Sequence, residues 1–307
     1  MSKKVIFIVG PTASGKTGLS IELAKRLQGE IISADSMQLY KGIHIASAAP
    51  DEEEKQGIPH HLLEFLELEN QFSVAEYVIK ARERINDICY RGKIPIVVGG
   101  TGLYISALVD NTQFSDEKID YELRQKLEDE FDRVGAEEML LRLKEFDPES
   151  AESLHPGDRR RIIRCFEIYE TTGKTKTMQN ELSHNEERDF DALVLGMNYK
   201  DRQKLYDRIN LRVDIMLENG LLQEAKQTFE KRNDKGAFQA IGHKELYGYF
   251  EGNTTLQEAT ELLKQQTRRY AKRQLTWFRK QEYINWIYAD ECENTVKEAL
   301  DLVGKFI

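Results

Sequence analysis

The segment GPTASGKT, residues 10–17, contains the residues whose spacing points most directly to chemistry. It fits the pattern G-x-x-x-x-G-K-[ST], in which backbone N–H groups surround an anion, the lysine neutralises phosphate charge and the hydroxyl ligates Mg²⁺. An apolar run precedes the segment and a helical pattern follows it, as the motif requires. The motif therefore predicts a phosphate site but leaves its ligand open. The predicted cradle consists of Gly10, Pro11, Thr12, Ala13, Ser14, Gly15, Lys16 and Thr17.

A carboxylate follows the second apolar run of the chain. Asp35 ends the run EIISAD, and Ser36 and Gln38 come within the next turn. A carboxylate facing the phosphate site can serve as a general base, and a glutamine amide can read the edge of adenine. The alternative for Asp35 is an N-cap of the next segment.

The third apolar run ends in VVGGTGLY. Its glycines Gly99, Gly100 and Gly102 permit close backbone approach, and Thr101 offers a hydroxyl at the edge where open α/β sheets bind ligands. An ATP-hydrolysing enzyme usually has a metal-binding carboxylate on a neighbouring strand, which this stretch lacks. A simple tight turn is the alternative for this segment.

Alternating elements must position these residues. Strand-like runs at 4–10, 30–35 and 94–100 alternate with amphipathic helical patterns, the longest at 73–92. This alternation predicts an α/β fold in which a P-loop-like parallel sheet is flanked by helices.

The sheet pattern stops after the third run. Helix formers dominate up to another apolar run, DALVLGMNY at 191–199, and the pattern beyond that run is helical to the end of the sequence. We therefore expect a core domain of residues 1–112 plus 191–307 with a helical C-terminal region, interrupted by an all-helical insertion domain at 113–190.

Composition narrows the function classes. The net charge of −9 argues against a nucleic-acid partner. However, the segment 264–280 carries seven Lys/Arg and no acid, so one face of the protein can still be basic. The three cysteines have no disulfide or zinc spacing, and no apolar run approaches the roughly 20 residues of a membrane helix. His60 and His61 lack a third metal ligand nearby in sequence. We expect a cytoplasmic protein.

Seven segments in order resemble the tRNA dimethylallyltransferase family, also called tRNA isopentenyltransferases. They are GPTASGKT, DSMQLY, PHHLLE, IPIVVGGTGLY, HPGDRRRIIRCFEIYETTG, AIGHKEL and AKRQLTWFRK, and they span about 4–279. The resemblance implies transfer of a dimethylallyl group from dimethylallyl diphosphate to the exocyclic amine of the adenosine 3′ of the anticodon, with Mg²⁺ and release of diphosphate. A diphosphate leaving group removes the need for a hydrolytic carboxylate.

The resemblance also implies roles for individual residues. Asp35 is the base, Thr101 hydrogen-bonds in the reaction channel, and Lys16 stabilises the diphosphate together with Arg208 and Arg212, which lie one helical turn apart. Thr17 is the expected metal ligand. The implied tRNA contacts are Asp35, Ser36, Met37, Gln38, Thr101, Arg159, Arg160, Arg161, Ile162, Ile163, Phe238, Gln239, Ala240, Ile241, Gly242, His243, Lys272 and Arg273.

Some residues depart from the family pattern or have an alternative role. Gly157 and Arg160 depart from the residues usual in the family, and Tyr270, Trp277 and Phe278 fit the core better than a base-stacking surface.

The rival functions are a small-molecule kinase, an RNA-binding protein without chemistry and an adenylate isopentenyltransferase. We expect a monomer whose insertion moves as a unit to clamp the anticodon stem-loop of tRNA.

Overall fold

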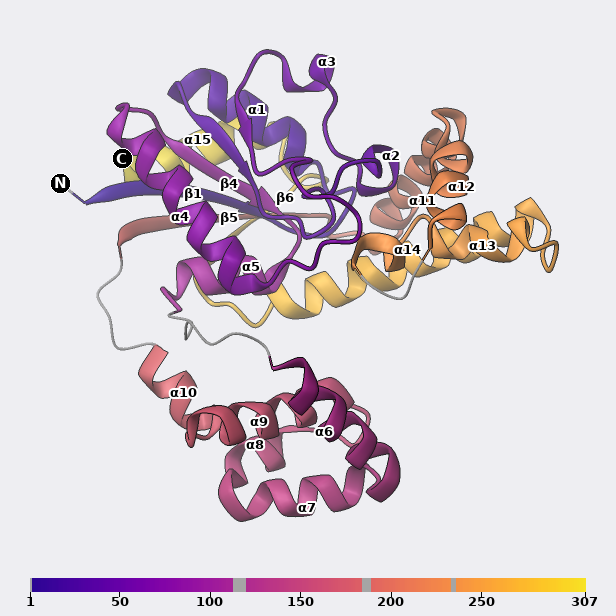
Figure 1. Cartoon of the computed structure of the whole chain (residues 1–307). Coiled ribbons are helices and arrows are strands. Elements are labelled where there is room, and N and C mark those ends of the chain that lie inside the picture. The colour runs from indigo at the N-terminus through magenta and orange to yellow at the C-terminus, as the bar shows by residue number, and fades with distance from the viewer. Residues whose placement is uncertain (1, 113–119, 184–188, 233–235) are drawn as a thin grey trace. The chain divides into compact units, whose positions relative to one another are not determined.

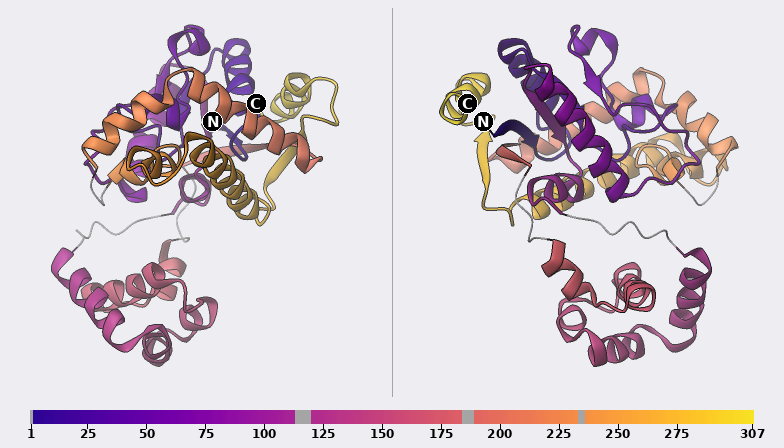
Figure 2. Two further views of the ribbon diagram at one scale, coloured as in Figure 1. Left: turned by 90° about the vertical axis from the view of Figure 1, so that its right-hand side faces the viewer. Right: turned by 60° about the vertical axis from the view of Figure 1, so that its left-hand side comes forward.

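The computed structural model describes residues 2–112, 120–183, 189–232 and 236–307. The chain divides into two compact units, which we call the core unit (residues 1–109 and 189–307) and the insertion unit (110–188). Figures 1 and 2 show a sheet flanked by helices in the core unit and only helices in the described part of the insertion unit. The predicted fold class is confirmed.

All strand pairs of the core sheet are parallel, in the order β3-β2-β4-β1-β5-β6. Three of the strands predicted from sequence, β1, β4 and β2, lie side by side, with Val9 beside Gly99 and Ser33 beside Val98. The carboxyl ends of these strands therefore meet at one edge, as ligand binding in this fold requires. The strands are β1 (Lys3–Val9), β2 (Glu30–Ser33), β3 (His60–His61), β4 (Pro95–Gly99), β5 (Phe190–Asn198) and β6 (Ile284–Tyr288).

The prediction of a wholly helical C-terminal region is wrong in one element. The segment INWIY forms β6, which pairs with β5 at the edge of the sheet. Its aromatic and β-branched residues suit a strand, but the run is short and follows a long helix, so its pairing with a distant strand decided its structure.

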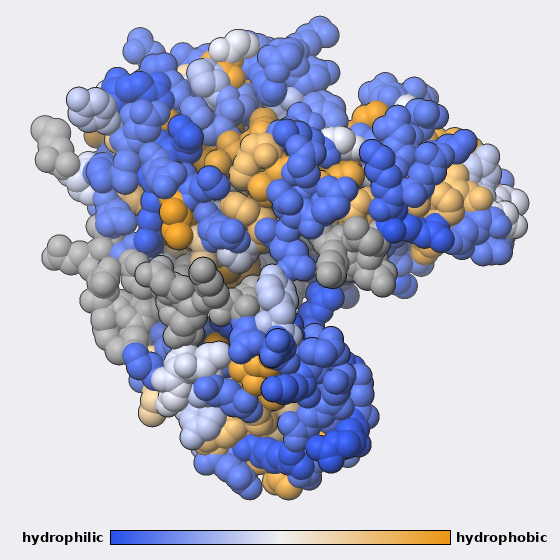
Figure 3. All heavy atoms as spheres, viewed as in Figure 1, coloured by the Kyte–Doolittle hydropathy of each residue, from blue (hydrophilic) through white to orange (hydrophobic). Residues whose placement is uncertain are grey.

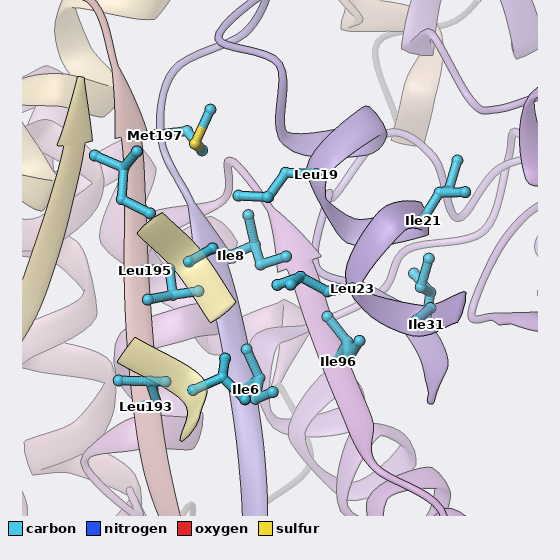
Figure 4. Close-up of a cluster of buried hydrophobic side chains, with 14 residues drawn as sticks. Ile6, Ile8, Leu19, Ile21, Leu23, Ile31, Ile96, Leu193, Leu195 and Met197 are labelled. Carbon is cyan, nitrogen blue, oxygen red and sulfur yellow. The ribbon is translucent and has the colours of Figure 1, made fainter. Parts of the chain in front are cut away.

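Apolar side chains on both faces of the sheet form the core. Ile6 and Ile8 pack with α1 (Lys16–Leu27) and α15 (Thr295–Phe306) in the cluster drawn in Figure 4. Val5, Phe7 and Val9 alternate with them and are also fully buried, so the opposite face is covered as well. Burial on both faces explains why these strands read as continuous apolar runs.

Further helices of the core unit cover the second face and extend one side of the unit (Figure 1). The helix predicted at 73–92 runs from Val74 to Tyr90, and a capping box formed by Ser73 and Glu76 fixes its start. The remaining helices are α2 (His44–Ser47), α3 (Glu52–Lys55), α4 (Val74–Tyr90), α5 (Gly102–Val109), α11 (Arg202–Glu218), α12 (Leu221–Glu230), η1 (Gly236–Gln239), α13 (Lys244–Phe250) and α14 (Leu256–Phe278).

The insertion unit has its own apolar core. Leu127, Phe131, Met139, Ile162 and Ile163 from three helices form it. The unit therefore holds together through its own packing. Its helices are α6 (Tyr121–Val134), α7 (Ala136–Phe146), α8 (Pro148–Ser153), α9 (Arg159–Thr172) and α10 (Lys176–Ser183).

Most of the face seen in Figure 3 is hydrophilic, with apolar side chains gathered in small patches. Within the part of the chain that the structure describes, no helix has the length and apolar character needed to cross a membrane.

Candidate active site

The phosphate loop joins β1 to α1, as predicted. Gly10 has φ +142° and a Cβ there would lie 2.2 Å from the Met197 carbonyl oxygen, so this position accepts only glycine without rearrangement. Gly15 has φ +96° and precedes the first helical residue. Both glycines are needed for the sharp turn that directs backbone N–H groups inward. The hydroxyl of Ser14, in the same loop, is buried without a hydrogen-bond partner.

Buried cations lie close together around this loop. The Lys16 ammonium turns back on the loop and donates a 2.7 Å hydrogen bond to the Pro11 carbonyl. Removal from water and the nearby positive charge of Arg212 lower the pKa of Lys16 to about 7, although Asp35 opposes this effect. Burial chiefly, and Arg208 to a smaller extent, also lower the pKa of Arg212, although Asp35 and Glu54 oppose this effect. Cations that repel one another inside a protein define a site suited to an anion.

Arg208 and Arg212 both contact the phosphate loop. Arg208 donates through Nε to the Ala13 carbonyl at 2.9 Å, and Arg212 lies 3.4 Å from the Thr12 hydroxyl. Helix α11 thus supports the loop and supplies charge to it.

Asp35 and Thr101 are brought together at the carboxyl edge of the sheet. One Asp35 oxygen accepts the Met37 N–H at 2.9 Å, and the Thr101 hydroxyl accepts the Ser36 N–H at the same distance. Asp35 is half-buried and its charge acts on Lys16, Arg212 and the Tyr270 hydroxyl. Burial and this negative charge raise the pKa of Tyr270. The carboxylate lines one cavity together with Lys16 and Arg212.

Two cavities in the core unit meet at the phosphate loop. We call the one lined by Asp35, Gln38 and Tyr270 the base-side cavity, of about 380 Å³. The other, the loop-side cavity, is about 490 Å³ and is lined by Ser14, Arg208 and exposed apolar residues of α11. Lys16, Thr17 and Arg212 line both cavities. An anion held by these residues would reach the base-side cavity, where the carboxylate lies.

The glycines at the end of β4 approach neighbouring protein atoms closely. A Cβ on Gly99 would lie 2.1 Å from the Ala34 carbonyl oxygen, one on Gly100 would lie 2.1 Å from the Gln274 amide nitrogen, and one on Gly102 would enter the Trp277 ring. These glycines allow β4 and its turn to pack against β2 and α14. Gly99 and Gly100 also line the base-side cavity.

Gln38 lines the base-side cavity, but its amide is already occupied. Its oxygen accepts from the Ser33 hydroxyl at 2.9 Å, and its nitrogen donates to the carbonyls of Ser47 and Ala48 at 3.3 and 3.0 Å. In this arrangement Gln38 holds the short α2 segment against β2. Reading an adenine edge would require it to release these bonds. Ser36 and Met37 also line the cavity.

The segment 238–243 contributes backbone and small groups to the site. Ala240, Ile241 and Gly242 line the base-side cavity, whereas Phe238 and His243 are fully buried. His243 bonds to Thr228 and Glu224 at 3.2 and 2.9 Å. The side chain of Gln239 lies outside the described residues.

The basic segment of α14 divides between surface and interior. Lys272 and Arg273 are exposed, and Arg273 also lines the base-side cavity. Phe278 is buried and the Trp277 ring donates to the Ser106 hydroxyl at 3.1 Å, in line with the core role predicted for them.

In the insertion unit, the predicted segment 159–163 opens α9. Arg160 and Arg161 are exposed, whereas Ile162 and Ile163 belong to the apolar core, so their side chains face away from solvent. Arg159 pairs with Asp132 and lies 5.0 Å from the Phe131 ring centre. Asp158 occupies the N-cap position, but its carboxylate accepts from the His155 N–H instead of a helix amide.

Both histidines of PHHLLE have protein partners. His60 Nδ1 lies 2.8 Å from the Ile58 carbonyl oxygen, and His61 Nε2 lies 2.8 Å from the Glu30 carboxylate. Among the described residues no group of three His, Cys, Asp or Glu is arranged to hold a metal.

Sequence reasoning missed Gln274 and placed Tyr270 in the core. Tyr270 lines the base-side cavity, and Gln274 contacts both the phosphate loop and the turn after β4. One signal was available: Gln274 lies on the helix face that buries Ala271 and Phe278, and a polar residue on such a face needs buried partners.

These features define a phosphate-loop α/β protein in which an anion site faces a carboxylate across a shared cavity. Residues 38–281 match the family model described as IPP transferase. The chain belongs to the IPP transferase family. A relative from Acetivibrio thermocellus, named tRNA dimethylallyltransferase, is 49% identical over 295 residues, which cover 95% of this chain and 94% of the relative.

Solved structures agree with this assignment. The structure of a tRNA isopentenylpyrophosphate transferase from Bacillus halodurans is 40% identical, with a TM-score of 0.73 and coverage of 99% of this chain and 96% of the other. A eukaryotic dimethylallyltransferase described as acting on tRNA is 32% identical, with a TM-score of 0.83 and coverage of 100% and 81%. The family model begins at residue 38, after the phosphate loop, but these relatives span almost the whole chain.

Proposed function

We propose that this enzyme transfers a dimethylallyl group from dimethylallyl diphosphate to N6 of the adenosine 3′-adjacent to the anticodon in tRNA, and releases diphosphate. The relatives' names support the activity and the tRNA substrate. The observation that carries the chemistry is the anion site of Lys16 and Arg212 facing Asp35 across one cavity.

In the proposed reaction N6 of adenine bonds to the allylic carbon, the carbon–oxygen bond to the diphosphate breaks, and the N6 proton passes to Asp35. The departing diphosphate gains negative charge, which Lys16, Arg212 and the loop N–H groups stabilise. The adenine amine is a weak nucleophile, so a base that accepts its proton contributes roughly 10²- to 10⁴-fold. The reacting adenosine must leave its stack to enter the cavity.

Mg²⁺ fits the residues that are present. Thr17 lies in the first turn of α1, lines both cavities and offers a hydroxyl beside the anion site. Mg²⁺ commonly takes few protein ligands, with phosphate oxygens and waters completing its shell. When bound, it would add positive charge at the diphosphate. Thr17 is the residue we propose to hold it.

We further propose that tRNA contacts both units. In the core unit Lys272 and Arg273 are exposed on α14, and in the insertion unit Arg160 and Arg161 are exposed on α9. Exposed cations of this kind suit backbone phosphates. The buried side chains of Phe238, His243 and Ile162 would act through neighbouring backbone rather than by direct contact.

The test is mass spectrometry of nucleosides after the full chain is incubated with an anticodon stem-loop RNA, Mg²⁺ and dimethylallyl diphosphate. We expect one added dimethylallyl group on adenosine, and none when guanosine replaces the target adenosine. Parallel reactions with free adenylate, and with labelled ATP and nucleosides, separate the rivals. Product from adenylate alone, or phosphate transfer from ATP, would overturn the proposal.

A further inference from the structure

Gln274 of α14 bridges two loops that meet at the candidate active site. Its carbonyl oxygen accepts the Thr12 N–H of the phosphate loop at 2.8 Å, and its amide nitrogen donates to the Gly100 carbonyl at 3.0 Å. Gln274 is buried, with only 5% of the residue exposed. A buried amide is costly unless both its ends are hydrogen-bonded, and here both ends are used.

The bridge fits its surroundings closely. A Cβ added to Gly100 would lie 2.1 Å from the Gln274 amide nitrogen, so the turn approaches the side chain as near as a glycine allows. Tyr270 lies one helical turn earlier, and its hydroxyl interacts with Thr101 and Gln274. Ala271 and Phe278 are buried on the same helix, which fixes the face that Gln274 presents.

The two ends of the bridge belong to the two halves of the proposed chemistry. Thr12 lies in the loop that carries Lys16, and its hydroxyl is near Arg212. Gly100 precedes Thr101, whose hydroxyl accepts the N–H of Ser36 next to Asp35. Gln274 thus lies between the anion site and the segment that carries the base.

We propose that Gln274 is a positioning residue that fixes the phosphate loop relative to the Asp35 edge of the sheet. This inference rests on the proposed function, since it concerns the separation of the leaving group from the base. Misplacement of reacting groups by about 1 Å can cost on the order of a hundredfold in rate. Gln274 itself lies inside the protein and needs no contact with RNA.

The test compares Gln274→Met with the wild type and with Gln257→Met, which makes the same change at an exposed position of α14. Methionine keeps the length of the side chain but removes both hydrogen bonds. For Gln274→Met we expect the single-turnover rate per folded molecule to fall about ten- to a hundredfold, with tRNA affinity within about twofold of wild type. Inorganic diphosphate should bind several-fold more weakly, because the loop loses its support.

A coupling experiment guards against a simple loss of folding. Gly100→Ala places a methyl group against the Gln274 amide and should reproduce the rate loss. In the Gln274→Ala background this methyl has room, so Gly100→Ala should add little further loss. Additive losses of the single-turnover rate would contradict the proposal that Gln274 bridges the two loops.

Failure of the inference is distinguishable from failure of the proposed function. Unchanged rate and diphosphate affinity in Gln274→Met, with an active wild type, would reject the positioning role alone. If the wild type forms no prenylated adenosine, the function is rejected, whereas the diphosphate titration still tests the bridge.

Discussion

Glu30 begins β2 and Asp35 follows the end of the same strand, yet the surroundings of the two carboxylates differ sharply. Glu30 is buried and bonds to Arg91, Lys93 and His61. Its hydrogen bonds, above all those from Arg91, hold its pKa well below the usual range. Asp35 is half-buried and accepts a backbone N–H from Met37.

The cations near Glu30 and those near Asp35 also differ in their surroundings. Around Glu30 they gather on one negative charge, whereas Lys16 and Arg212 repel each other and their pKa values are lowered. At the amino edge of the sheet the charges of Glu30 and its cations neutralise one another. At the carboxyl edge the cations repel each other, so this edge suits a bound anion. Neutralising substitutions at the two ends of β2 should therefore have opposite consequences.

Asp35→Asn should give the largest loss of activity. It keeps the side-chain shape and the acceptor for the Met37 N–H but removes the base, so turnover should fall by roughly 10²- to 10⁴-fold. Filter binding should show unchanged tRNA affinity, and the melting temperature should stay near the wild-type value. Near-normal turnover would exclude Asp35 as the base.

Lys16→Met should separate activity from stability. Loss of the ammonium should lower turnover by roughly 10²- to 10³-fold. The free protein should be as stable as wild type or slightly more stable, because burial and Arg212 disfavour the charged lysine. Urea unfolding without ligand provides the measurement. A clear loss of stability would show that Lys16 is structural instead.

Glu30→Gln should lower stability but leave activity nearly unchanged. Arg91 and Lys93 lose their buried counter-charge, and because both are partly exposed we expect a cost of about 2–3 kcal/mol in the free energy of unfolding. Turnover per folded molecule should remain within about twofold of wild type. A specific activity that falls with stability would link this cluster to catalysis.

The Glu30 effect should also depend on pH. Since its pKa is lowered from 4.5, the stabilisation is present above that pH and is lost as the pH falls towards the lowered value. Urea unfolding of wild type and Glu30→Gln should therefore converge in acid. If the difference in the free energy of unfolding between the two proteins stays constant with pH, the charge of Glu30 is not the source of the stabilisation.

The smallest expected effect concerns the pH dependence of diphosphate binding. Lys16 is half neutral near pH 7 in the free protein, and a bound anion favours its charged form. Binding should take up a proton above pH 7, and affinity should fall roughly tenfold from pH 7 to pH 8.5. Calorimetry in two buffers of different ionisation enthalpy measures this. Lys16→Met is the control, because diphosphate itself titrates; an identical pH slope in this variant would contradict the assignment.

Local patterns predicted the phosphate loop, four strands of the sheet and the helical insertion. These features depend on residues near in sequence: Gly10 and Gly15 form the turn, and continuous apolar runs mark strands buried on both faces. The short strand β6 was missed because its partner is some ninety residues earlier, as in the pairing of Val194 with Ile284.

Local sequence patterns could not predict those details of the site that depend on contacts between residues far apart in sequence. The glycines at the end of β4 suggested a close approach of the backbone, but local patterns could not show that their protein neighbours are Ala34, Gln274 and Trp277. Gln38 suggested base reading, but its amide bonds to the α2 segment. In both cases the residue type indicated a close contact, and only the folded chain could show its partner.

The most direct test of the account is calorimetric titration of inorganic diphosphate with Mg²⁺ into wild type, Lys16→Met and Glu30→Gln. We predict that wild type and Glu30→Gln bind with equal affinity and that Lys16→Met binds at least tenfold more weakly, as expected for loss of a charge at an anion site. Equal binding by wild type and Lys16→Met would contradict the claim that the carboxyl edge of the sheet holds the diphosphate.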